Sequence, residues 1–197
     1  MKLLSIISIA TVAAILTGCA GAPPAAMKKA EVKAMSENPM VGGAAMFSSK
    51  NIIENAVNSK DHTTLVAAVK AAGLVETLSG PGPFTVFAPV NSAFDALPAG
   101  AVANLLKPEN KAALTKVLTC HVVGANAMSF AIKKMIADDA GTHPVKTLGG
   151  CVLQARYKGN KITLTDENGR VATVTIADVK QSNGVIHVID TVLLPKQ

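Results

Sequence analysis

The chain has 197 residues with a formal net charge of +6, and 49% of its residues are apolar. That apolar content is enough for a hydrophobic core and excludes wholesale disorder. With no Trp, one Tyr and five Phe, the chain lacks the aromatics that a stacking platform for single-stranded nucleic acid needs. Its three cysteines, without a glycine or heptad period, exclude disulfide-rich, collagen-like and coiled-coil classes. The composition predicts one globular domain with a short appendage.

The N-terminal segment has the pattern of an export signal. Lys2 is followed by the uncharged stretch 3–16, which suits a signal peptide and is shorter than the ~20 residues that span a bilayer. The stretch leads into Leu-Thr-Gly-Cys at 16–19, which resembles a bacterial lipobox, although an ordinary signal peptide followed by a chance cysteine is the alternative. We predict that residues 1–18 are a lipoprotein signal peptide and that Cys19 is lipidated. Ala20, in place of the Asp of inner-membrane retention, favours anchoring to the outer membrane or cell surface.

Residues 19–46 are predicted to be the lipidated cysteine followed by a flexible tether. Proline and glycine pairs interrupt regular structure here, and a coil of about 27 residues spans about 30 Å. Four methionines recur in the segment, and thioethers bind Cu(I). A copper or small-ligand carrier is therefore an alternative function, although the spacing is irregular and no His or Cys lies among the methionines, which are Met27, Met35, Met40 and Met46.

The sequence pattern predicts mainly helices in the first half of the region 47–197. Helical periodicity predicts helices over 51–59 and 61–74, the second with Asp61 as its N-cap. Asn91 is predicted to cap a helix that carries Phe94, and two more helices begin near the prolines at 98 and 108. One short strand, 84–88, is predicted between the turn at 81–83 and the proline at 89.

The second half changes to the period of strands. The predicted strands are separated mostly by Gly and Asn-Gly turns, and they span 145–148, 151–157, 161–165, 171–176 and 185–194. Helices followed by a meander of strands predict an α+β domain without internal repeats.

Two long stretches resemble the signatures of the fasciclin-like domain family. The first is TVFAPVNSAF at 85–94, with Thr85, Phe87, Pro89, Asn91 and Phe94, and the second is NGVIHVIDTVLLP at 183–195, with Asn183, Gly184, His187 and Asp190. The resemblance extends over about residues 47–195. It implies a fasciclin-like wedge of two β-sheets with several helices packed along one side. It also implies adhesion or interaction with matrix, receptors or surface glycans, and not catalysis.

The residue pattern of both signatures predicts that they lie in the hydrophobic core. The strand at 84–88 has apolar residues on both faces, and so does the strand that follows Gly184, which predicts that the latter is central in its sheet. We therefore expect the signature residues to define the fold and to leave recognition to other parts of the surface.

The resemblance also implies candidate partner-binding residues. Family contacts involve a Tyr-His pair and an Asp-Ile pair before the second signature. Cys120-His121 occupies the first place here and Asp178-Val179 the second, so His121, Asp178 and Val179 are the candidates. Cys120 replaces the aromatic residue, which argues against an animal-type receptor. A solvated acid at a turn edge is the alternative interpretation of Asp178.

The histidines and cysteines give no catalytic pattern. His121 and His187 lie in apolar runs without a third ligand at useful spacing, so core histidines bonded to backbone are expected in preference to a metal site. Cys120 and His121 are adjacent and therefore diverge in a strand or a helix, which excludes a thiolate–imidazole pair. We predict no enzymatic activity, no metal and no cofactor.

With Cys19 lipidated, two cysteines remain in an oxidising compartment. An even remainder predicts a disulfide between Cys120 and Cys151, and two buried free thiols are the alternative. Taken together, the sequence predicts an exported, monomeric adhesion or interaction module that is anchored by lipid. Its partner would be an unknown surface protein or glycan, with the membrane held through the lipid and no nucleic acid bound.

Overall fold

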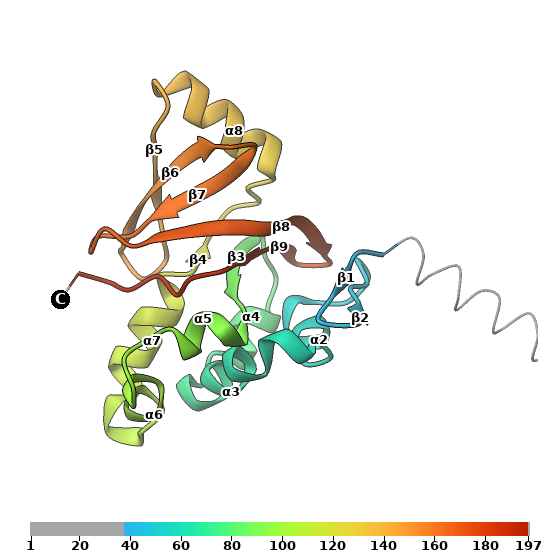
Figure 1. Ribbon diagram of the computed structural model, residues 1–197. Helices are drawn as coiled ribbons and strands as arrows, with labels where there is room; N and C mark the ends of the chain where they lie inside the picture. Colours follow the sequence, from blue (N-terminus) through green and yellow to red (C-terminus); the bar gives the residue numbers. More distant parts are fainter. Residues whose placement is uncertain (1–37, 197) are drawn as a thin grey trace, which may run out of the picture. The chain divides into compact units, whose positions relative to one another are not determined.

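The computed structural model describes residues 38–196 of the chain (Figure 1). The predicted signal peptide, Cys19 and most of the tether lie outside the described residues. The described residues belong to one compact unit that contains helices and strands, which confirms the predicted α+β class.

Most of the helices precede the strands, as expected. Among residues 38–196, the first six are α2 (Ile52–Ala56), α3 (Thr63–Ala72), α4 (Val75–Ser79), α5 (Asn91–Asp95), α6 (Ala101–Leu105) and α7 (Lys111–Thr119). Short 3₁₀ helices at Lys60–His62 and Pro108–Asn110 lead into α3 and α7. One further helix, α8 (Ser129–Asp138), follows strand β4 (Val122–Val123), and neither α8 nor α4 was predicted.

The strands form one large sheet and one small one. The small sheet pairs β1 (Met40–Val41) with β2 (Ala44–Ala45). The large sheet has the order β4-β3-β9-β8-β7-β6-β5. Its strands are β3 (Phe84–Pro89), β4 (Val122–Val123), β5 (His143–Lys146), β6 (Val152–Lys158), β7 (Lys161–Thr165), β8 (Val171–Gln181) and β9 (Gly184–Ile189). β3 and β9 run parallel, and the other neighbours are antiparallel.

The two sheets expected from the family are two halves of this large sheet, joined by β8. The start of β8 pairs with β7, and the rest pairs with β9 across bulges between Val174 and Val179. A bulge bends a strand and increases its twist, so the two halves turn away from each other. The ends of the curved sheet are also linked, because the Leu148 N–H donates to the Val122 C=O at 2.8 Å.

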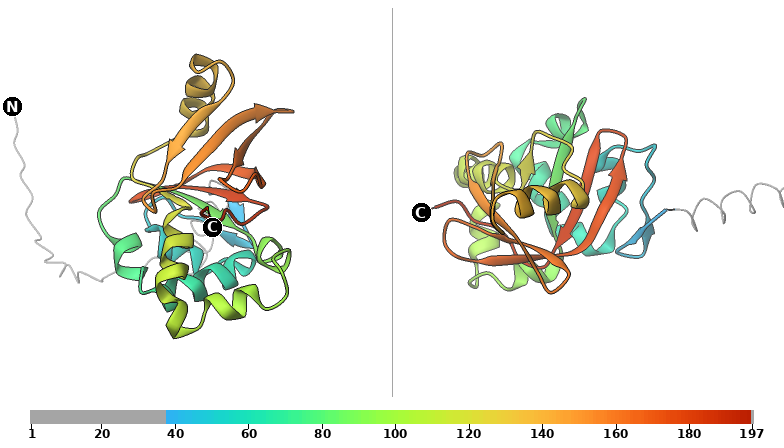
Figure 2. Two further views of the ribbon diagram at one scale, coloured as in Figure 1. Left: turned by 90° about the vertical axis from the view of Figure 1, so that its left-hand side faces the viewer. Right: turned by 90° about the horizontal axis from the view of Figure 1, so that it is seen from above.

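Two hydrophobic cores lie on opposite faces of β3 and β9. Helices α2–α7 cover one side, and α8 with strands β5–β7 lies on the other (Figures 1 and 2). Val86 and Ile186 face the helical core, whereas Phe87 and Ile189 face the core beneath α8. Alternation along two neighbouring strands thus supplies both cores, and β9 is central, as predicted.

The structure corrects several predicted boundaries. The tether was expected to end at residue 46, but β1 and β2 lie before that point, and Val41 and Met46 are buried in the helical core. α3 begins at Thr63 and not at Asp61. β5 begins two residues earlier than expected, β8 continues to Gln181, and β9 ends at Ile189. Local periodicity misplaced the C-terminal ends of β8 and β9. The reason is that β8 continues through its bulges, whereas the chain after β9 leaves the sheet while staying largely buried.

Candidate functional site

The first signature uses its polar residue to fix a loop. The Thr85 hydroxyl donates to the Ala125 C=O at 2.6 Å and accepts the Ala127 N–H at 2.8 Å. Phe87, next along β3, is buried and stacks on His187 with ring centroids 5.7 Å apart. Pro89 and Phe94 are also buried. This signature therefore lies in the interior and orders the loop that precedes α8.

Asn91 has a different role from the predicted one. The side chain makes no capping bond to its own helix. Its Oδ1 instead accepts the Thr64 N–H at 3.1 Å, and its Nδ2 donates to the Lys60 C=O at 2.8 Å. Asn91 thus caps α3, which is distant in sequence. A sequence pattern indicates that a residue is a capping type, but it does not say which helix the residue caps.

The second signature joins the sheet to the helices. Asn183 accepts the Ile52 N–H at 3.1 Å and donates to the carbonyls of Leu78 and Gly80 at 2.8 and 3.0 Å. Gly184 lies against the Phe84 carbonyl, and a Cβ there would overlap it.

The end of the second signature is held in the same way. Asp190, just after β9, accepts the Thr173 N–H at 2.8 Å. These residues hold backbone groups together, so like the first signature they build the fold.

His121 is a core residue and not a surface contact. Its side chain is buried, with Nδ1–H donating to the Val117 C=O at 2.8 Å and Nε2 accepting the Leu193 N–H at 2.9 Å. Burial lowers the pKa of His121 to about 4, so the ring is neutral at pH 7. Its inclusion among the partner-binding candidates is corrected accordingly.

The Asp178-Val179 pair is also structural. Val179 is buried in the helical core. Asp178 sits at the bulge of β8 with φ +60°, and its carboxylate accepts the N–H and hydroxyl of Ser129 at 2.7 and 2.5 Å. A carboxylate stabilises the N-terminus of a helix, so Asp178 anchors α8. In the described structure neither Val179 nor the engaged carboxylate of Asp178 presents a free contact for a partner.

His187 matches the expectation of a backbone-bonded core histidine. Its Nε2–H donates to the Ala127 C=O at 2.8 Å, and its Nδ1 accepts the Asp178 N–H at 3.2 Å. Burial lowers the pKa of His187.

Cys120 and Cys151 are joined by a disulfide, with their Cα atoms 5.4 Å apart. The bridge connects the end of α7 to the start of β6. It lies close to the hydrogen bond between Leu148 and Val122, so both links hold the ends of the curved sheet together.

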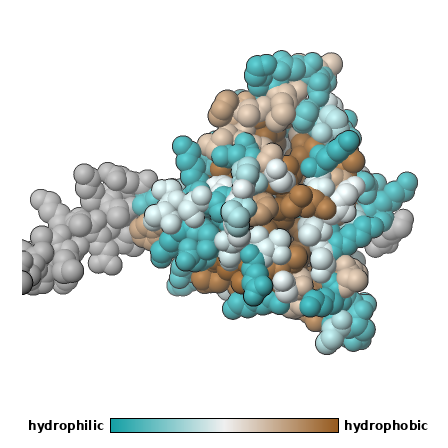
Figure 3. Space-filling model, turned by 180° about the vertical axis from the view of Figure 1, so that it is seen from behind, coloured by the Kyte–Doolittle hydropathy of each residue, from teal (hydrophilic) through white to brown (hydrophobic). Residues whose placement is uncertain are grey.

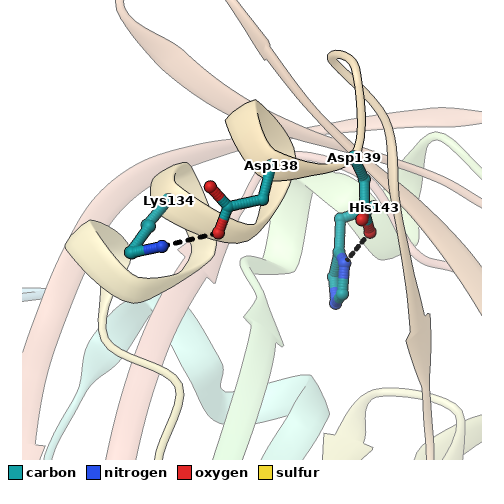
Figure 4. A network of polar contacts seen from close by, with 4 residues as sticks. All are labelled: Lys134, Asp138, Asp139 and His143. Atoms are coloured by element: carbon teal, nitrogen blue, oxygen red, sulfur yellow. Dashed lines mark hydrogen bonds and ion pairs between the residues drawn. The ribbon is translucent and has the colours of Figure 1, made fainter.

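A groove of about 340 Å³ lies between α8, β4 and β5. Its lining is mainly apolar and includes Phe87, Ile132 and Val145. His143, also in the lining, contacts Asp139 at the end of α8, with Nδ1 and Oδ2 2.6 Å apart (Figure 4). Among the described residues that line the groove there is no Ser, Thr or Cys. The groove therefore offers apolar contact, one imidazole and the Lys146 amine, and its described lining has no hydroxyl or thiol nucleophile.

Seen from behind, hydrophobic residues gather in the middle of the molecule, and hydrophilic residues surround them (Figure 3).

Between residues 38 and 196, no group of three or more His, Cys, Asp or Glu side chains is placed to hold a metal ion. Within the same range, no helix has the length and apolarity needed to cross a bilayer.

One surface feature was missed by the sequence reasoning. Phe130 on α8 is 70% exposed, and Tyr157 on β6 is 43% exposed. The Lys133 ammonium lies 4.8 Å from the centre of the Tyr157 ring. The sequence carries part of this feature as the adjacent lysines Lys133 and Lys134, but their place beside Tyr157 depends on how α8 packs on β6.

The comparison with family models gives a match to the Fasciclin domain over residues 60–195. Protein sll1483 of Synechocystis is 48% identical over 181 residues, which cover 91% of this chain and 92% of that protein. The cell surface glycolipoprotein MPB83 of Mycobacterium bovis is 34% identical over 191 residues, with 93% and 79% covered. The pig transforming growth factor-beta-induced protein ig-h3 is 39% identical over 131 residues, which are 66% of this chain and 17% of that protein.

A solved structure has the same fold. It is a FAS1 domain pair from the insect cell adhesion molecule fasciclin I, with a TM-score of 0.65 and 17% sequence identity. The match covers 74% of this chain and 51% of that one, so this chain spans about half the length of the domain pair.

Proposed function

We propose that this chain, which belongs to the fasciclin domain family, is an adhesion or interaction module held at a cell surface by lipid on Cys19. The family is generally one of non-enzymatic adhesion domains. Its members include an insect cell adhesion molecule and a mycobacterial cell surface glycolipoprotein. These relatives support an exported protein that binds a surface protein or glycan.

The observation that supports this function most is the use made of the signature residues. Thr85, Asn91 and Asn183 all bond to backbone groups of the protein itself. Phe87 and His187 are buried against each other. The long signatures thus account for the fold and leave no converging catalytic groups among them, which supports recognition by the outer surface.

The copper-carrier alternative loses several of its proposed ligands. Met46 is buried in the core, and so are His62, His121 and His187. Met27 and Met35 lie outside the described residues. No observation on the described residues favours this alternative over adhesion.

The anchor is tested in producing cells by comparing the parent chain with Cys19→Ser. A labelled acyl chain should be incorporated into the parent only, and the parent alone should partition with membranes after high-salt washing. Ala22→Ser is the matched control, because it introduces a serine near the site while keeping the Cys19 thiol. Labelling of Cys19→Ser, or no labelling of the parent, would contradict the lipid anchor.

Adhesion is tested separately with cells that lack the chain. These cells should attach less to neighbouring cells or to a matrix-coated surface, and the parent chain should restore attachment. Unchanged attachment with and without the chain would contradict the adhesion function, whatever the outcome for the lipid.

A further inference from the structure

The net charge of the described residues is confined to one part of the fold. The segment 129–165, which runs from α8 to the end of β7, has six Lys and Arg but only two acids, Asp138 and Asp139. The rest of the described chain has nine basic and nine acidic residues. The whole excess of four positive charges therefore lies on the side of the sheet opposite α2–α7 (Figure 1).

Exposed aromatic side chains lie within this basic segment. We call them, with the neighbouring lysines, the α8–β6 patch, which consists of Phe130, Lys133, Lys134, Tyr157, Lys158 and Lys161. Phe130, Lys133 and Lys134 are spaced i, i+3 and i+4 and so share one face of α8. Lys133 connects this face to β6 through the Tyr157 ring, and Lys158 pairs with Lys161 across the hairpin.

Most of the patch charge is free of acidic partners in the described structure. Lys134 bonds Asp138 at 2.6 Å (Figure 4). Within residues 38–196, Lys133, Lys158 and Lys161 have no acid within ion-pair distance. The apolar side chain of Phe130 is 70% exposed to solvent. The patch thus combines an exposed ring with ammonium groups that have no acidic partner among these residues, so apolar contact and positive charge lie on one surface.

We propose that the α8–β6 patch docks the domain on an anionic lipid bilayer, with Phe130 and Tyr157 entering the interface and the lysines meeting lipid phosphates. This inference rests on the proposed membrane anchoring. Aromatic rings and lysines together suit the boundary between headgroups and acyl chains, where rings are buried and ammonium groups remain in water. A neutral glycan would instead be held by placed hydrogen-bond acceptors and donors, whereas the patch offers mainly lysine ammonium groups beside two aromatic rings.

The length of chain outside the structure allows this docking. Asn38 is 19 residues after Cys19, and a fully extended chain of that length reaches at most about 65 Å. A domain of this size has a radius of gyration of about 15 Å. The patch can therefore reach the bilayer in which Cys19 is anchored, and docking would fix the orientation of the opposite, helical side toward a partner.

The test uses the full chain in vesicles, with an environment-sensitive dye on a new cysteine, Phe130→Cys. Vesicles are made of phosphatidylcholine alone or of phosphatidylcholine with phosphatidylglycerol, and both contain a quencher attached to the lipid chains. The matched control is Val171→Cys, which is exposed to a similar degree at 52% but lies outside the patch. The parent chain is labelled in parallel to subtract any dye on native cysteines.

The dye at position 130 should be quenched in the anionic vesicles and much less in phosphatidylcholine alone, whereas the dye at 171 should stay bright in both. Lys133→Glu and Lys158→Glu should each lower the ratio of docked to undocked protein at least about fivefold, which is about 1 kcal/mol per lysine. High salt should also reduce quenching, because exposed charges are screened.

Three results would overturn the proposal: equal quenching at both positions, quenching that does not depend on the anionic lipid, or no quenching at 130. A larger dye response to a soluble sulfated polysaccharide than to the vesicles would also overturn it and assign the patch to an acidic glycan. Failure of lipid attachment is scored independently by the acyl label on Cys19, so the two proposals can fail separately.

Discussion

Mild acid is expected to destabilise the domain, because the fold buries histidines in their neutral form. His121 has both ring nitrogens bonded to backbone, and its Nε2 must stay unprotonated to accept the Leu193 N–H. Burial also lowers the pKa of His62 and of His187. The perturbation is a fall in pH from about 7 to about 5, a range in which ordinary carboxylates remain mostly ionised.

The direction and the size of this destabilisation follow from the pKa of His121. In the unfolded chain this group takes up a proton near its ordinary pKa of 6.5, whereas in the folded protein it does so only near 4. Below pH 6.5 the unfolded state therefore binds more protons, and stability that is complete above 6.5 is lost as the pH falls toward 4. At about 1.4 kcal/mol per pH unit below 6.5, His121 alone accounts for a loss of about 2 kcal/mol between pH 7 and pH 5.

The assay measures the free energy of unfolding by urea titration at several pH values between 7 and 5. Between pH 7 and pH 5 the parent should lose about 2 kcal/mol through His121, and more through His62 and His187, whose pKa values burial also lowers. His121→Asn should be less stable at neutral pH but should show a slope lower by about one proton. Val171→Ala, at an exposed site without a titratable group, is the control and should keep the parent slope. Equal slopes for His121→Asn and the parent, or stability that rises with acid, would refute the reasoning.

Three further predictions concern single contacts. Replacing Cys120 and Cys151 together by Ser should lower the free energy of unfolding by about 3.5 kcal/mol, and the denatured, unreduced parent should show no reactive thiol from this pair; two titratable thiols would contradict the bridge. Asn91→Ala should cost about 1 kcal/mol in urea unfolding by uncapping α3, whereas Ser92→Ala beside it should cost almost nothing; equal losses would contradict the cap. Asp178→Ala should cost about 1–2 kcal/mol and speed amide exchange in α8; unchanged exchange there would contradict the anchoring of that helix.

The fold was largely predictable because its strongest signals are local or are shared by a family. β3 follows a rigid turn and ends at a proline, and β9 is apolar on both faces, so both could be placed from the sequence. α8 was missed because only Ile132 and Ile136 are buried along it, and its other apolar residues, such as the exposed Phe130, do not mark one buried face. Its N-terminus is stabilised by Asp178, which is 49 residues away, and such a cap leaves no local pattern.

The candidate site was harder to predict, because exposure is a property of the folded chain. His121 and Val179 occupy positions that the family resemblance assigned to partner contacts, yet both are buried here. The charge excess between residues 129 and 165 could have been counted from the sequence. What could not be known is that Lys133 would meet Tyr157, since that contact depends on how α8 crosses β6.

The central claim is that the two signatures form the interior of the domain and leave recognition to the surface. Amide hydrogen exchange of the full chain tests it most directly, strand by strand. The account predicts that the amides of β3 and β9 exchange slowest, at the rate of global unfolding, and that those at the end of the β6–β7 hairpin exchange much faster. Rapid exchange in β3 and β9 under native conditions would contradict it.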